Sequence, residues 1–128
     1  MENGFDIASI ERISKQRFSF ATRVQLLWKG GESFQILFDA VSRAERFVCL
    51  QFYIIKDDET GITVSELLRK KSREGTKVYI LYDHFGSLGT PRNFWKEMRR
   101  AGVEIRASHP FKWTSPFHYV RRDHRKLI

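Results

Sequence analysis

Segments with two different apolar periods alternate along most of this 128-residue chain, and this alternation constrains its fold more than any other feature. Phe47 to Ile55 is rich in β-branched and aromatic residues and is apolar on both faces, which is typical of a central strand in a parallel sheet. Residues 32–45 and Thr60 to Arg73, on either side of it, repeat apolar residues at three and four positions, which indicates amphipathic helices. A strand between two such helices predicts parallel strands joined by helical crossovers.

The alternation extends in both directions along the chain. Thr22 to Trp28 alternates and is expected to form a strand that ends at a glycine pair. Other strands are expected at Lys77 to Asp83, at Val103 to Ala107 and from about His124 onward, with a helix that Thr90 caps, Pro91 opens and Gly102 ends. We therefore predict an α/β fold with a mostly parallel sheet and helices on both faces.

The chain divides into an arm and one domain. Residues 1–21 contain a weak amphipathic helix marked by three isoleucines and are predicted to be an N-terminal helical arm. Residues 22–128 form the predicted domain. A strand normally runs for about five or six residues, so a last strand that stops at Ile128 indicates a domain truncated at its C-terminus. The apolar edge left unpaired there predicts that a partner covers it, by self-association or by crystal contacts.

Charge and composition point to anionic partners. The chain has 23 Lys and Arg against 15 Asp and Glu, a net charge of +8, which favours phosphate esters, nucleic acid or acidic lipid headgroups as partners.

The single cysteine, Cys49, excludes an intrachain disulfide and is expected to be a buried, inert thiol. The longest nearly apolar run, Phe47 to Ile55, is too short to span a bilayer, which needs about 20 residues. Any membrane contact by these residues would therefore be at the surface.

Polar residues follow the predicted strands at the edge where parallel sheets bind ligands. Asp83 and Ser87 are candidates for contact with a phosphate, although Asp83 could equally cap the following turn. Tyr53 either packs in the core or lines the site. The acidic run from Asp57 to Glu59 is interpreted as a solvated turn that opens a helix, and the histidines show no paired metal spacing, so no metal is predicted.

His124 and Lys126 stand two residues apart at the start of the last predicted strand, so their side chains would lie on one face. An imidazole and an ammonium side by side suit attack on phosphorus, because one group supplies the nucleophile and the other offsets charge on the phosphoryl oxygens. On spacing alone, this pair with its neighbours Arg122 and Arg125 is equally consistent with a basic tail.

Five segments in order give the pair a context. They are Gly30 to Phe34, Gln51 to Gly61, Leu81 to Ser87, Arg99 to Glu104 and Arg122 to Ile128. Across residues 22–128 they resemble the phospholipase D superfamily, and most closely the bacterial cardiolipin synthase-like phosphatidyltransferases, whose signature is His-x-Lys-x4-Asp.

The resemblance implies a role for each residue of the terminal motif. His124 would be the nucleophile that forms a phosphohistidine, Lys126 would bind the phosphoryl oxygens, and Arg122 and Arg125 are further phosphate-binding candidates. No cofactor or metal is implied. The motif aspartate would be the fifth residue after Lys126, and a second motif would come from another half of the same chain or from a homodimer. The present chain alone is thus expected to have little or no turnover.

The resemblance also implies a phosphatidylglycerol-like substrate and a cytoplasmic protein, peripheral at the inner face of the cell membrane. Residues 108–120 form an aromatic loop in which Phe111, Trp113 and Phe117 would lie at headgroup depth, or alternatively fold over the sheet as core. Water as the acceptor would make the protein a phospholipase D-type hydrolase. Two other readings stay open: a nuclease of the same superfamily, and a non-catalytic module that binds anionic lipid or nucleic acid through the basic cluster at 69–73 and the terminal one. Nucleic acid is the less favoured partner, because the five segments are cardiolipin synthase-like.

Overall fold

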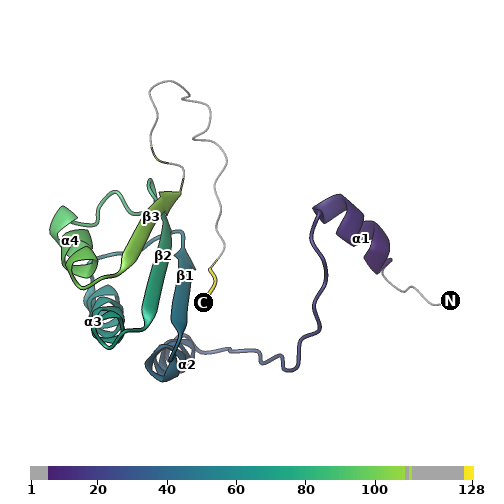
Figure 1. The fold of residues 1–128 in the computed structure, drawn as a ribbon, viewed down its shortest axis with the longest axis horizontal. Coiled ribbons are helices and arrows are strands. Elements are labelled where there is room, and N and C mark those ends of the chain that lie inside the picture. Colours follow the sequence, from purple (N-terminus) through teal and green to yellow (C-terminus); the bar gives the residue numbers. More distant parts are fainter. Residues whose placement is uncertain (1–5, 109, 111–125) are drawn as a thin grey trace.

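The fold is built on a three-stranded parallel sheet in the order β1-β2-β3 (Figure 1). A computed structural model describes residues 6–108, 110 and 126–128. The strands are β1 (Phe47–Phe52), β2 (Lys77–Asp83) and β3 (Glu104–Ser108), and the helices are α1 (Ile7–Ser14), α2 (Gly30–Arg43), α3 (Glu59–Arg73) and α4 (Arg92–Arg100). The predicted α/β class with a parallel sheet is confirmed.

The register of the strands aligns their β-branched and aliphatic residues in rows. Val48 pairs with Val78 and Leu50 with Ile80, and all four are buried on the same face. Leu68 and Met98, each 1% exposed, come from α3 and α4 and pack in the same cluster, which α2 completes with Leu37 and Val41. The core therefore lies between one face of the sheet and the helices α2, α3 and α4, which Figure 1 shows gathered on one side.

The opposite face of the sheet carries a different set of residues. The register aligns Cys49 with Tyr79 and Glu104, and of these Cys49 and Glu104 are exposed. Within the part of the chain that the structure describes, helices thus cover one face of the sheet and not both faces as predicted. The expectation that Cys49 is buried is wrong, because residues alternate across a strand and Cys49 lies between the core residues Val48 and Leu50.

The segment at 22–28 differs from the prediction of a strand. It pairs with none of the three described strands, and its Val24 and Trp28 are 88% and 84% exposed. Alternation provides a face to bury, but a strand also needs a neighbour for its backbone N–H and C=O groups. In Figure 1 the chain instead runs through this segment as an extended link between α1 and α2.

The ends of several elements are set by capping contacts. Gly75 and Gly102 have φ values of +94° and +95°, the left-handed conformation that ends α3 and α4, and Gly102 thus ends α4 as predicted. Pro91, rather than Thr90, occupies the N-cap position of α4, and the Thr90 hydroxyl instead donates a hydrogen bond to the Ile55 carbonyl.

Among the described residues, no helix combines the length and the apolar character that a membrane span requires.

Candidate phosphoryl-transfer edge

Asp83 ends β2 at the carboxyl edge of the sheet and organises the turn that follows. Its side chain is 2% exposed, and its Oδ1 accepts hydrogen bonds from the backbone N–H groups of Phe85 and Gly86, each at 3.0 Å. This is the turn-capping role that the sequence left as one of two alternatives. A Cβ added at Gly86 would lie 2.3 Å from the carbonyl oxygen of Tyr53, so the turn packs directly on the chain that leaves β1.

The same turn holds Ile55 through both of its backbone polar groups. Ser87 Oγ accepts a hydrogen bond from the Ile55 N–H at 3.1 Å, and Thr90 Oγ1 donates one to the Ile55 carbonyl. Ser87 and Thr90 are 4% and 8% exposed. Buried hydroxyls that satisfy a backbone in this way order the segment they contact. Ile55 and the residues after it therefore leave the sheet along a defined path.

The acidic segment after Ile55 is a helix cap, as the sequence predicts. Asp57, Asp58 and Glu59 are exposed, and Asp58 Oδ1 accepts the N–H of Gly61 at 2.9 Å at the start of α3. A Cβ at Gly61 would lie 1.9 Å from the carbonyl oxygen of Lys56, so this chain reversal requires glycine. Across the described residues, no three His, Cys, Asp or Glu side chains gather as they would around a metal ion.

The C-terminal residues lie beside β1. Leu127 and Gln51 exchange two backbone hydrogen bonds, of 2.9 Å and 3.0 Å, in an antiparallel bridge near the carboxyl end of that strand. Lys126 is exposed and precedes this bridge. It therefore lies at the edge where parallel sheets bind their ligands.

Lys126 also lines a cavity of about 340 Å³ between β1 and the helices. Most of the lining is apolar and includes Phe34 of α2, Phe52 of β1 and Val64 of α3. The cavity was not predicted from the sequence. The signal for it lies in the apolar helix faces that Phe34 and Val64 occupy, but periodicity does not say where such faces leave a gap.

Comparison with known proteins gives a consistent family. The chain is 39% identical to cardiolipin synthase A of Pseudomonas fluorescens over 106 residues, which cover 82% of this chain and 22% of that protein. It is 35% identical over 118 residues to cardiolipin synthase of Halalkalibacterium halodurans, covering 91% and 24%. It is 32% identical over 121 residues to cardiolipin synthase 2 of Bacillus anthracis, covering 92% and 23%.

This is a cardiolipin synthase-like chain of the phospholipase D superfamily. The resemblance found in its sequence is thereby confirmed. The chain spans about a quarter of the length of the curated relatives it matches. No protein-family model and no solved structure matches it.

The predicted site residues of this cardiolipin synthase-like chain fall into two groups. Tyr53, Asp83, Ser87 and Lys126 lie at or near the carboxyl edge of β1 and β2. Of these, Tyr53 is half-buried, Asp83 and Ser87 are buried in the turn network, and Lys126 is exposed. Their contact with a phosphate stays a prediction. The other candidates lie outside the described residues: His124, Arg122, Arg125, Phe111, Trp113 and Phe117.

Proposed function

We propose that this chain supplies one half of a phosphatidyl-transfer site in a cardiolipin synthase-like enzyme. The observation that carries the proposal is the bridge between Leu127 and Gln51, which holds Lys126 at the carboxyl edge of the sheet. The names of the similar proteins support the reaction class.

The reaction proceeds in two displacements at phosphorus. An imidazole nitrogen of His124 bonds to the phosphorus of a phosphatidylglycerol-like lipid, and the bond to the headgroup alcohol breaks. A hydroxyl of a second such lipid then attacks the phosphohistidine and releases His124. The Lys126 ammonium offsets the charge that builds on the phosphoryl oxygens in both steps. The histidine of a second motif, in the same polypeptide or in a homodimer, protonates the first leaving alcohol and takes the proton from the second.

The substrate class sets the place of action. A lipid phosphodiester is reached at the membrane surface, and we place the protein at the cytoplasmic inner face, held peripherally. In the proposal, the aromatic residues Phe111, Trp113 and Phe117 contribute to this contact, and basic side chains of the chain bind the anionic headgroups.

Trapping of the intermediate tests the mechanism. A longer protein that contains this chain is incubated with phosphatidylglycerol labelled in its phosphate, and acid-labile, alkali-stable protein-bound label is measured. We expect label in the unmodified protein and in His84→Ala, and none in His124→Ala. Equal label in His124→Ala would refute the assignment of the nucleophile. The 128-residue chain alone should show little or no turnover, and turnover by it that His124→Ala abolishes would contradict the need for a second motif.

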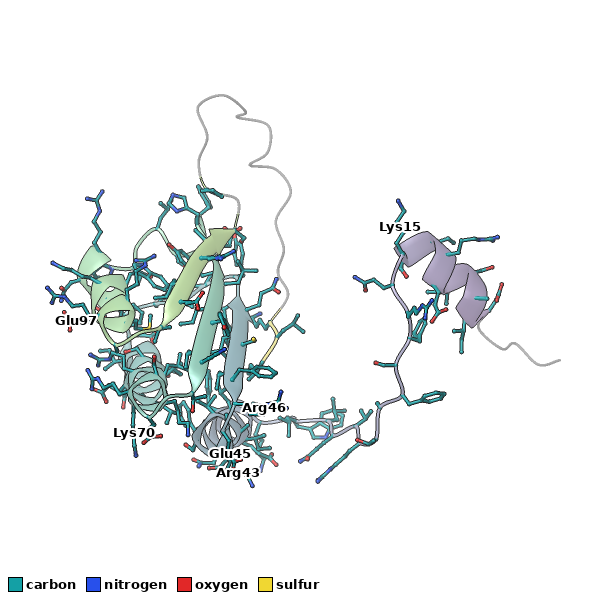
Figure 2. The ribbon with its side chains drawn as sticks, viewed as in Figure 1. Lys15, Arg43, Glu45, Arg46, Lys70 and Glu97 are labelled. Carbon is teal, nitrogen blue, oxygen red and sulfur yellow. The ribbon has the colours of Figure 1, made fainter. Side chains whose placement is uncertain are left out.

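The net charge of +8 favours a second candidate, a non-catalytic module that binds anionic surfaces. The basic cluster at 69–73 gives it limited support, because neighbouring carboxylates accompany several of its cations. Lys71 Nζ lies 3.3 Å from a Glu74 oxygen, and Lys70 Nζ lies 4.0 Å from the other. Figure 2 shows Lys70 on the outer side of α3. Salt-sensitive binding to both anionic vesicles and DNA, without phosphohistidine formation in the longer protein, would establish this module instead.

A further inference from the structure

The cavity beside Lys126 opens to solvent and ends on buried residues of the core. Its deep wall includes Leu68 and Met98, each 1% exposed, whereas Phe34 on its wall from α2 is 43% exposed. The volume of about 340 Å³ falls within the range of small-molecule pockets. A hydrocarbon group fits such walls, because they offer dispersion contacts and few polar partners.

The charged residues of the lining lie on its solvent side. They are Lys56, Asp58 and Lys126, and all three are exposed. The Asp58 carboxylate already accepts the N–H of Gly61 as a helix cap. Two ammonium groups and one carboxylate give the lining residues themselves a net charge of +1, which complements an anionic group.

The frame of the cavity is held in place before any ligand arrives. Ile55, which lines it, is fixed by the buried hydroxyls of Ser87 and Thr90 on the neighbouring turn. Gly61, also in the lining, packs against the Lys56 carbonyl. A preformed wall costs little ordering on binding, which favours occupancy by a flexible chain.

We propose that this cavity binds one acyl chain of the phospholipid whose phosphate Lys126 contacts. The inference rests on the proposed function for the identity of the lipid, while its own basis is the apolar depth and the cationic opening of the cavity. An acyl chain seated here would orient the phosphodiester toward the edge of β1. The cavity thus acts as a subsite that selects a lipid over a water-soluble phosphodiester.

Calorimetric titration of the 128-residue chain with n-alkyl phosphates, each below its micelle-forming concentration, tests this. Each added methylene should tighten binding about fourfold until the cavity is full, after which affinity should level off. An alkyltrimethylammonium of equal length should bind at least about tenfold more weakly, because its charge opposes the lysines. An affinity that does not change with chain length would overturn the proposal.

Matched variants locate the binding. Val64→Trp fills the cavity from α3 and should abolish the dependence on chain length, whereas Ile62→Trp on the same helix, 43% exposed and outside the lining, should preserve it. Phe34→Glu gives a second blocking variant, at a position that is 43% exposed. Lys126→Ala should weaken the binding of alkyl phosphates of every chain length by a similar factor. Unchanged binding by both folded blocking variants would overturn the proposal.

The two proposals can fail separately. If binding by the 128-residue chain depends on chain length while no phosphohistidine forms in the longer protein, the acyl-chain subsite stands and the transfer mechanism falls. If the phosphohistidine forms but the affinity for alkyl phosphates does not change with chain length, the acyl-chain subsite is refuted and the transfer mechanism stands.

Discussion

Gly61→Ala gives a sharp test of the chain reversal between β1 and α3. The new Cβ would lie 1.9 Å from the Lys56 carbonyl oxygen, so the backbone at Lys56 would have to retreat by about 1 Å. Overpacking of this kind costs about 1–3 kcal/mol, and disturbing the Asp58 cap costs about 1 kcal/mol more. Alanine recovers about 0.5–1 kcal/mol because it is a better helix former than glycine. We expect a net loss of about 1–3 kcal/mol.

Gly31→Ala is the matched control, because Gly31 also lies in the first turn of a helix but has no atom within 4 Å of an added Cβ. There the helix preference of alanine acts alone, and a gain of up to about 1 kcal/mol is expected. Urea unfolding followed by circular dichroism measures both free energies. A Gly61→Ala chain as stable as the unmodified chain, or stabilised like Gly31→Ala, would refute the close packing of Lys56 on α3.

Three further predictions use the same unfolding assay or a related one. Thr90→Val leaves the Ile55 carbonyl without its hydroxyl donor in a buried setting and should cost about 1–3 kcal/mol; no loss would contradict the bond. Leu68→Ala should cost about 2–5 kcal/mol, since this residue is 1% exposed in the core, and a loss below 1 kcal/mol would argue against that burial. A hydrogen bond from Ser9 lowers the pKa of Asp6. The capping of α1 should therefore be complete above the ordinary aspartate pKa and weaken as the pH falls through the lowered pKa of Asp6. The chemical shift of the Ser9 amide in nuclear magnetic resonance would report this loss. A change in that chemical shift that begins above the ordinary aspartate pKa would contradict the prediction.

For Asp83 and Ser87 the sequence predicted the position in the fold but not the contacts. The sequence placed Asp83 and Ser87 at the end of a strand, which is where the structure has them. It left open whether Asp83 caps the turn, because that depends on whether the Phe85 and Gly86 N–H groups turn back toward the carboxylate. The contact of Ser87 with Ile55 links residues 32 positions apart, and no local pattern encodes it.

The sequence by itself determined the succession of helices and strands at 32–45, 47–55, 60–73 and 77–83, because period and capping are local properties of the chain. The tertiary structure decided what those elements face. It placed α2, α3 and α4 on one side of the sheet, left 22–28 unpaired with the described strands, and opened an apolar cavity beside Lys126. These outcomes depend on how side chains from distant segments fill a shared volume, and periodicity carries no information about that volume.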